Sequence, residues 1–147
     1  QWKNARQEGS GIELWPSGAK YEGQWESGTK KGNGTFIWAD GSKYEGSFLQ
    51  DDIHGVGTYQ WHDGRQFSGQ WVRNQMHGKG KFRWPDGREY EGDYMRDQMH
   101  GTGTFKWPDG RSYDGSWKNG KQHGAGKYKN SKGEEENGDW NEGRRVK

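Results

Sequence analysis

Aromatic and polar residues alternate along short stretches of this chain, and turn-forming residues separate the stretches. Residues 90–94 (YEGDY) place two tyrosines and a glycine on one face of an extended chain and two acids on the other. Residues 80–84 (GKFRW) place a phenylalanine and a tryptophan opposite a lysine and an arginine in the same way. A helix would distribute these residues around its axis, so the period of two predicts β-strands.

Turn signals join these strands into hairpins. In residues 85–87 (PDG), Pro85 fixes φ, Asp86 can hydrogen-bond its own backbone, and Gly87 takes the left-handed conformation. The same tripeptide returns at residues 108–110. We therefore expect successive antiparallel hairpins.

The pattern repeats every 23 residues without insertion or deletion, and four columns of equivalent positions hold all 22 aromatic residues. The columns are Tyr21, Tyr44, Phe67, Tyr90, Tyr113; Trp2, Trp25, Phe48, Trp71, Tyr94, Trp117, Trp140; Phe36, Tyr59, Phe82, Phe105, Tyr128; and Trp15, Trp38, Trp61, Trp84, Trp107. A lone hairpin buries too little apolar surface to fold, so the repeats are expected to stack on one another.

Another column contains only residues that tolerate a left-handed backbone. It reads Gly28, Asp51, Asn74, Asp97, Gly120 and Gly143. Glycine, asparagine and aspartate are the residues that adopt positive φ most readily. This column is therefore predicted to be a turn position with positive φ.

The repeats predict a single array over residues 1–147. We expect a partial repeat at 1–20, repeats at 21–43, 44–66, 67–89, 90–112 and 113–135, and a degenerate unit at 136–147. Near the C-terminus, Asn130 and Glu136 replace aromatic residues. The negative charge that Glu136 adds to the edge of the sheet discourages pairing with a further strand. At the other end Gln1-Trp2 matches Gln24-Trp25, so we expect a piece of a longer protein, with more repeats or another domain upstream.

The amino-acid composition limits the classes of protein to which this chain can belong. Hydrophobic residues make up only 25% of the chain and the mean hydropathy is −1.55, yet 15% of residues are aromatic, so aromatic rings must supply the core. There is no cysteine, which excludes disulfides and thiol chemistry and suits a reducing compartment. We find no signal peptide and no apolar run of membrane-spanning length. A net charge of +2 gives no reason to expect nucleic acid as a partner.

The stretch from Tyr113 to Tyr128 (YDGSWKNGKQHGAGKY), preceded by WPDG at 107–110, closely resembles the MORN (membrane occupation and recognition nexus) repeat. The resemblance covers nearly the whole chain. It implies an all-β fold, an elongated, twisted antiparallel sheet of tandem β-hairpins with an aromatic-lined groove. It also implies scaffolding, protein docking or dimerisation, and phosphoinositide binding has been proposed for several members. The chain departs from the motif at Phe67-Ser-Gly and at Asp51-Asp52.

Catalysis finds little support in the sequence. One histidine per repeat, at His54, His77, His100 and His123, precedes a Gly-x-Gly pair. Equivalent positions lie two strands, or about 10 Å, apart, which is too far for two imidazoles to share one metal ion. No Gly-x-Gly-x-x-Gly opens a helix, and no acid–base pair is arranged around the Glu22, Glu45 and Glu91 column. We therefore expect no enzyme, no catalytic residue, no metal and no cofactor.

The aromatic face is the first candidate binding surface. A single-layer sheet cannot cover this face with a second layer, and exposed aromatic edges usually mark a partner. The predicted groove residues, expected to dock a peptide or a helix, are Trp61, Phe67, Trp71, Trp84, Tyr90, Tyr94, Trp107 and Tyr113. The alternative is that these rings pack only on one another.

The polar face is the second candidate, because it begins apolar and ends basic. The candidate residues for an anionic lipid head group are Arg73, Lys79, Lys81, Arg83, Lys106, Lys127 and Lys129. The alternative is neutralisation by neighbouring acids, namely Glu91, Asp93 and Asp114. The apolar residues Ile12, Leu14 and Ile37 suggest a contact with upstream sequence or a self-association surface.

These surfaces lead to two main hypotheses. The first is a non-catalytic protein-interaction scaffold that docks a peptide or helical segment, with a homodimer as a further option. The second is a peripheral membrane module that binds phosphoinositide head groups. An aromatic platform for sugars or choline-like cations ranks last, since it rests on ring abundance alone. We expect a cytoplasmic location, with membrane or cytoskeletal association left open.

Overall fold

A computed structural model describes residues 2–3, 6–7 and 9–146, with side chains from residue 9 onward. Every regular element in these residues is a β-strand. The strands are β1 (Trp2–Lys3), β2 (Arg6–Gln7), β3 (Gly9–Leu14), β4 (Lys20–Glu26), β5 (Thr29–Ile37), β6 (Lys43–Leu49), β7 (Asp52–Gln60), β8 (Gln66–Val72), β9 (Gln75–Arg83), β10 (Glu89–Met95), β11 (Gln98–Lys106), β12 (Ser112–Lys118), β13 (Lys121–Lys129), β14 (Glu135–Asn141) and β15 (Arg144–Arg145).

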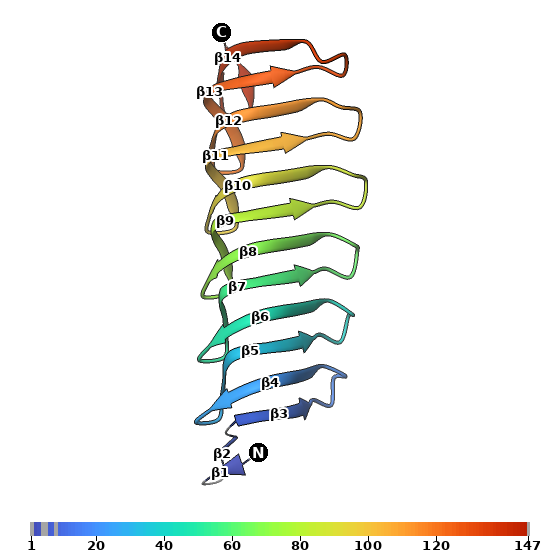
Figure 1. The fold of residues 1–147 in the computed structure, drawn as a ribbon, viewed down its shortest axis with the longest axis vertical. Coiled ribbons are helices and arrows are strands. Elements are labelled where there is room, and N and C mark those ends of the chain that lie inside the picture. The colour runs from blue at the N-terminus through green and yellow to red at the C-terminus, as the bar shows by residue number, and fades with distance from the viewer. Residues whose placement is uncertain (1, 4–5, 8, 147) are drawn as a thin grey trace. The chain divides into compact units, whose positions relative to one another are not determined.

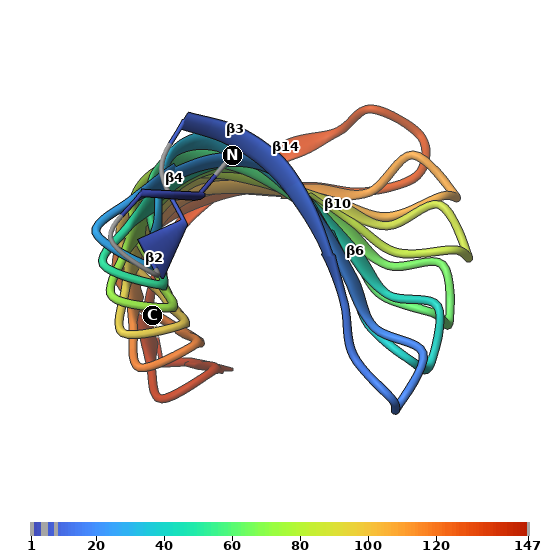
Figure 2. The ribbon, with the colours of Figure 1, turned by 90° about the horizontal axis from the view of Figure 1, so that it is seen from below.

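The chain forms two compact units, residues 1–75 (unit 1) and 76–147 (unit 2). In unit 1, strands β3 to β8 are neighbours in chain order, and β1 and β2 form a separate pair. In unit 2, strands β9 to β15 are again neighbours in chain order. Figure 1 shows each unit as successive hairpins, and Figure 2 shows that the strands bend along their length. The expected all-β fold of tandem antiparallel hairpins is confirmed.

Strand register brings like residues together within each hairpin. Tyr90 of β10 lies opposite Phe105 of β11, and Gly92 lies opposite Gly103. A Cβ atom on Gly103 would overlap the hydroxyl group of Tyr90. The glycines beside the rings are therefore required because the tyrosine ring lies directly over the backbone.

A β-bulge and a tyrosine hydroxyl coincide in most repeats. The pairing of β10 with β11 shifts between Gly92 and Tyr94, and the Tyr90 hydroxyl donates to the carbonyl oxygen of Asp93 at 2.9 Å. The bond recurs from Tyr21 to Gln24 (2.9 Å), Tyr44 to Ser47 (3.0 Å) and Tyr113 to Ser116 (2.9 Å). Each of these tyrosines therefore hydrogen-bonds the residue at the β-bulge of its own strand.

From Gly9 onward every member of the first two aromatic columns is buried, together with Phe82 and Phe105 of the third column. In unit 2 the buried Tyr113 ring meets Trp117 at 5.2 Å and Trp140 at 4.8 Å between ring centroids, in edge-to-face geometry. In unit 1 the buried Tyr21 ring meets Trp25 at 5.0 Å and Phe48 at 5.2 Å in the same geometry. Such pairs contribute beyond the area they bury, so the edge-to-face network links consecutive hairpins.

The turn column has the predicted conformation. Its φ angles are positive at Gly28 (82°), Asp51 (70°), Asn74 (70°), Asp97 (69°), Gly120 (82°) and Gly143 (89°). The Asp97 carboxylate accepts the backbone N–H of Met76 at 2.7 Å, and Asp51 accepts that of Lys30 at 2.8 Å. The acids in this column therefore also tie each turn to the preceding hairpin of the same unit.

The Pro-Asp-Gly turns also follow the predicted mechanism. Gly87 has a φ of 100° and donates its N–H to the carbonyl oxygen of Trp84 at 3.0 Å. The Asp86 carboxylate accepts the backbone N–H of Arg88 at 3.0 Å. In Figure 1 these turns join β9 to β10 and β11 to β12 at the right-hand side.

Candidate functional site

Half-buried tryptophans and the rings between them form a continuous row in each unit, which we call the tryptophan ladder. In unit 1 the ladder runs from Trp15 to Phe36 (5.3 Å between centroids), Trp38 (4.6 Å), Tyr59 (5.0 Å) and Trp61 (4.5 Å). In unit 2 it runs from Phe82 to Trp84 (4.4 Å), Phe105 (5.3 Å) and Trp107 (4.6 Å). All five tryptophans retain solvent access, whereas Phe82 and Phe105 between them are buried.

The structure separates the predicted groove residues into two groups. The buried group is Phe67, Trp71, Tyr90, Tyr94 and Tyr113. The half-buried group is Trp61, Trp84 and Trp107. A partner could touch only the second group without rearrangement of the core, and the first group holds the ladder in place from beneath.

An arginine covers three of the ladder tryptophans, a feature that the sequence reasoning missed. The guanidinium carbons of Arg65, Arg88 and Arg111 lie 5.1, 5.0 and 5.1 Å from the ring centroids of the tryptophans four residues before them. The signal that could have revealed it is the Trp-x-Asp-Gly-Arg spacing, which unites a ring, an acid and a guanidinium in one turn.

The aspartate of each of these turns fixes the arginine. The Nε atom of Arg88 donates to the Asp86 carboxylate at 2.8 Å, and Arg65 and Arg111 do the same at 2.8 Å to Asp63 and Asp109. The backbone N–H of Arg88 lowers the pKa of Asp86, and the Arg88 side chain acts in the same direction. The acid is therefore ionised at neutral pH and holds the guanidinium over the ring.

Two ladder tryptophans in unit 1 lack this cover. Ala19 and Ser42 stand where the other turns have arginine. Ser42 is buried, and its hydroxyl oxygen accepts the backbone N–H of His62 at 3.1 Å. Asp40 accepts the N–H of Ser42 at 2.9 Å and has His62 Nδ1 at 3.4 Å, with no arginine beside it.

A lysine fills an aromatic cage in unit 1. The Nζ atom of Lys30 lies 5.5–5.7 Å from the ring centroids of Trp15, Tyr21, Trp25 and Phe36. The same atom lies 3.2 Å from Asp51 Oδ1, and the lysine side chain is 13% exposed. The ring cluster best suited to a choline-like cation is therefore already occupied by the chain's own ammonium group.

The polar face of unit 2 carries the basic candidates, and most of them have acidic neighbours. Lys79 lies 2.8 Å from Asp93, Lys127 lies 3.8 Å from Glu135, and Glu89 lies 3.7 and 3.6 Å from Lys81 and Arg83. The hydrogen bond from Lys79 lowers the pKa of Asp93. Lys106 and Lys129 have no ion-pair partner among the described residues. Arg73, in unit 1, donates its backbone N–H to His54 Nδ1 at 3.2 Å.

A shallow hollow on the polar face of unit 2 has a volume of about 630 Å³. Its lining includes Asp114 and Asp139 together with Lys127 and Asn137, and the remaining lining residues are alanine and glycines. Two carboxylates face one ammonium group here. The hollow therefore favours no anion.

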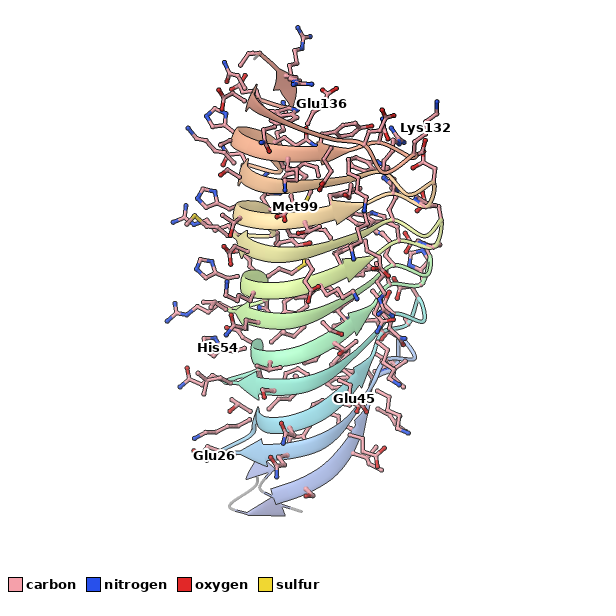
Figure 3. All side chains as sticks on the ribbon, turned by 45° about the horizontal axis from the view of Figure 1, so that its top comes forward. Glu26, Glu45, His54, Met99, Lys132 and Glu136 are labelled. Atoms are coloured by element: carbon pink, nitrogen blue, oxygen red, sulfur yellow. The ribbon has the colours of Figure 1, made fainter. Side chains whose placement is uncertain are left out.

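Two of the histidines in this column hydrogen-bond to turns. His54 lies near the beginning of β7, as Figure 3 shows, and accepts the N–H of Arg73 in the turn after β8. His123 Nδ1 accepts the N–H of Glu142 at 3.3 Å in the corresponding way. No group of three potential metal ligands occurs within the residues that the structure describes.

Comparison with protein families gives one match, the MORN repeat, at residues 1–20, 21–43, 44–64, 67–87, 90–110 and 113–135. A search of curated proteins found no match. No helix in the described part of the chain is long and apolar enough to cross a membrane.

Solved structures give weak likenesses. The G-box domain of the microcephaly protein CPAP is 16% identical with a TM-score of 0.40, covering 86% of this chain and 73% of that one. The TCP domain of Drosophila melanogaster SAS-4, in complex with a proline-rich motif of Ana2, is 11% identical with a TM-score of 0.39, covering 88% and 83%. The Danio rerio CPAP TCP10 domain is 14% identical with a TM-score of 0.36, covering 91% and 68%. The family assignment rests on the repeat match.

Proposed function

Because this chain belongs to the MORN-repeat family, a non-enzymatic family of protein-interaction or membrane-binding modules, we propose that it is a protein-interaction scaffold without catalytic activity. In this proposal a peptide or helical segment of a partner protein docks on the aromatic face. The contacts are made by the ladder tryptophans, among them Trp61, Trp84 and Trp107. The buried rings Phe67, Trp71, Tyr90, Tyr94 and Tyr113 position the ladder.

One observation carries this proposal: the five ladder tryptophans remain half-buried, whereas the described rings of the first two aromatic columns are buried. Tryptophan is large, rigid and apolar with one polar N–H, and these properties make it a frequent anchor in protein interfaces. A row of such residues presents a repeated anchor along one side of each unit.

Affinity capture tests the scaffold proposal. The immobilised chain is compared with a Trp84→Leu/Trp107→Leu variant whose circular dichroism and melting temperature show that it is folded. A Val56→Ser variant is the matched control, because Val56 is 64% exposed and lies outside the ladder. We expect the tryptophan variant to lose partners that the control retains. Identical sets of bound proteins would contradict the proposal.

The alternative is a peripheral membrane module that binds phosphoinositide head groups. The observation that favours it is the presence of Lys106 and Lys129, both exposed and without an ion-pair partner among the described residues. Co-sedimentation with phosphoinositide vesicles at low and high salt tests it, since lysine-mediated binding weakens steeply with ionic strength. No binding at low salt would exclude this function.

Self-association is a further option within the scaffold proposal. Ile12 and Leu14 on β3 are 55% and 70% exposed, and Ile37 on β5 is 37% exposed. Solvent-exposed apolar side chains that lie close together are typical of an interface. A homodimer through this patch predicts a sedimentation coefficient that falls in an Ile12→Ser/Leu14→Ser variant.

The cellular location and the boundaries of the repeats belong to the same proposal. The absence of cysteine suits the reducing cytoplasm, with attachment to a membrane or to the cytoskeleton through the partner. The division into repeats at 1–20, 21–43, 44–66, 67–89, 90–112, 113–135 and 136–147 also stays a prediction.

A further inference from the structure

One row of side chains crosses the strands of unit 2 on the polar face, next to the Pro-Asp-Gly turns. Residues that lie directly opposite one another on antiparallel strands share a face, with Cβ atoms about 5 Å apart. Basic and acidic residues alternate along this row except at one position, where a serine lies between two lysines. In order of strand pairing from β9 to β14, the row is Arg83, Glu89, Lys106, Ser112, Lys129 and Glu135.

The acids of this row are already engaged by other cations. The two carboxylate oxygens of Glu89 lie 3.7 Å from Lys81 Nζ and 3.6 Å from Arg83 Nε. Glu135 lies 3.8 Å from Lys127 Nζ. An acid at this place in the repeat therefore attracts basic side chains around it, and neither acid forms an ion pair with the two remaining lysines of the row.

Ser112 stands where the repeats before and after it have Glu89 and Glu135, which are 23 residues away in each direction. Its neighbours Lys106 and Lys129 are exposed, and neither has an ion-pair partner in the part of the chain that the structure describes. The Ser112 hydroxyl group likewise makes no hydrogen bond to a described residue. Two ammonium groups and a hydroxyl donor thus surround a position from which the negative charge is missing.

We propose that Lys106, Ser112 and Lys129 bind a phosphorylated serine or threonine of a partner protein, in an extended segment that carries a basic residue two positions away. This inference goes beyond the scaffold function proposed above, because the site lies on the polar face and is independent of docking on the ladder. It assigns a second binding surface to the chain and states the chemistry that this surface recognises.

The charges and donors favour a phosphoryl group over a carboxylate. At neutral pH a phosphorylated side chain carries a charge of about −1.5 to −2 and three acceptor oxygens. Lys106 and Lys129 together supply two positive charges, and the hydroxyl group of Ser112 between them supplies a third donor. A single carboxylate would leave one of the two positive charges uncompensated. Hydrogen bonds to an ionised group are roughly twice as strong as those between neutral groups.

The next residue on the same face of β12 accounts for the basic residue of the partner. Asp114 lies two residues after Ser112, about 6.8 Å along the strand. It is exposed, has no ion-pair partner among the described residues, and lines the hollow of about 630 Å³ together with Asp139. Same-face side chains of an extended partner recur at the same spacing. A phosphorylated residue at Ser112 therefore places a lysine or arginine two positions away over Asp114.

The acids around the site favour a protein segment over a membrane surface. Glu89 lies directly opposite Lys106. Glu135 lies directly opposite Lys129, so negative charge borders the site on both sides. A membrane presents many anionic head groups in one plane, and several of them would meet these acids. A peptide presents one phosphoryl group and can place a basic side chain against Asp114.

A titration followed by nuclear magnetic resonance tests the inference on the full chain. The probe is a short synthetic peptide with phosphoserine at its centre and lysine two residues to either side, so that it can bind in both chain directions. The control peptides have serine in place of phosphoserine, glutamate in its place, or the lysines moved next to the phosphoserine. An ionic strength of about 0.1 M screens exposed charges that lie more than about 10 Å apart.

Two pairs of variants separate the site from general effects of charge. Lys106→Gln/Lys129→Gln removes both lysines, and Lys118→Gln/Lys121→Gln is the matched control. The control removes the same charge from exposed lysines of β12 and β13 that lie roughly 20 Å along the strands from Ser112. Ser112→Glu supplies the missing acid from the chain itself, and Ser112→Gln has the same length without the charge.

We expect the probe to bind about tenfold more tightly than the peptides with serine or glutamate, and more tightly than the peptide with moved lysines. Lys106→Gln/Lys129→Gln should weaken the probe about tenfold, and so should Ser112→Glu when compared with Ser112→Gln. No binding of the probe, equal binding of the phosphoserine and glutamate peptides, or equal effects of the two lysine variants would overturn the inference. The comparison of peptides needs no variant, so it stands if a substitution disturbs the fold.

Failure of this inference and failure of the scaffold proposal have different signatures. The Trp84→Leu/Trp107→Leu variant should bind the probe as the unmodified chain does, and a loss of binding there would contradict a site on the polar face. Binding of phosphoinositide vesicles through Lys106 and Lys129, without binding of the probe, would assign both lysines to a membrane and overturn the protein partner. Absence of probe binding leaves ladder-dependent capture of partners, and with it the scaffold proposal, intact.

Discussion

The guanidinium carbon of Arg88 lies 5.0 Å from the centre of the Trp84 ring, and Asp86 holds the arginine there through its Nε atom at 2.8 Å. This arrangement makes the tryptophan both part of the fold and a shielded surface. Arginines lie over Trp61, Trp84 and Trp107, whereas Ala19 and Ser42 stand at the equivalent positions after Trp15 and Trp38, so the repeats differ in the side chain beside the ladder ring.

Removing the arginine should expose the ring. We expect Arg88→Ala to increase quenching of tryptophan fluorescence by the neutral quencher acrylamide, with little loss in the free energy of unfolding, because the ion pair is exposed. Arg83→Ala, on the polar face, is the matched control and should leave the quenching unchanged. Unchanged quenching in Arg88→Ala would show that the arginine does not cover the indole in solution.

The hydroxyl of Tyr90 fastens the bulged residue Asp93, so its removal should destabilise unit 2. Tyr90→Phe is expected to lower the free energy of unfolding by about 1 kcal/mol, the usual contribution of one such hydrogen bond. Urea denaturation measures the change. Phe67→Tyr is the reciprocal variant and is expected not to destabilise the chain. Equal stability of Tyr90→Phe and the unmodified chain would contradict the role of the hydroxyl.

The glycine opposite a bulge should tolerate no side chain. In Gly103→Ala the new methyl group would overlap the Tyr90 hydroxyl, and since the ring is fully buried it has no space to move. We expect a loss of about 2–3 kcal/mol, typical of overpacking in a closed core. Thr102→Ala, at the exposed neighbouring position, should change stability by less than about 0.5 kcal/mol. A similar loss in both variants would contradict the close approach of ring and backbone.

Alkaline pH should unfold the array through its tyrosines. Burial raises the pKa of Tyr21 and of Tyr44 to about 12, whereas an unfolded tyrosine titrates near about 10. The protonated phenols therefore contribute their full stability below pH ~10, and that contribution disappears as the pH rises towards 12. Circular dichroism and tyrosinate absorbance should change together in this window. Tyrosinate formation near pH 10 in a chain that stays folded would contradict the burial of these rings.

Much of the fold could be predicted from the sequence because each structural position recurs in several repeats, so the residue type that it requires can be recognised. The period of two, the Pro-Asp-Gly turns and the Gly28 column all led to features that the structure confirms. The bulge at Asp93 could not be predicted, because a one-residue shift in pairing leaves the aromatic columns unchanged. The hydrogen bond from Tyr90 was missed for the same reason.

The candidate site was harder to predict than the fold. Columns of aromatic residues show which rings share a face, but they do not show that Tyr90 and Tyr113 lie beneath the surface while Trp84 and Trp107 reach it. Depth depends on how consecutive hairpins of one unit cover each other's rings, and that depends on strand curvature and ring tilt rather than on spacing along the chain.

The central claim is that the ladder tryptophans are the docking surface, and the indole N–H signals of the ten tryptophans test it most directly by nuclear magnetic resonance. On titration with a partner recovered by capture on the immobilised chain, the account predicts that the signals of Trp61, Trp84 and Trp107 shift in a saturable way, while those of the buried Trp71 and Trp117 stay in place. Shifts confined to residues of the polar face, with all ladder signals unchanged, would contradict it.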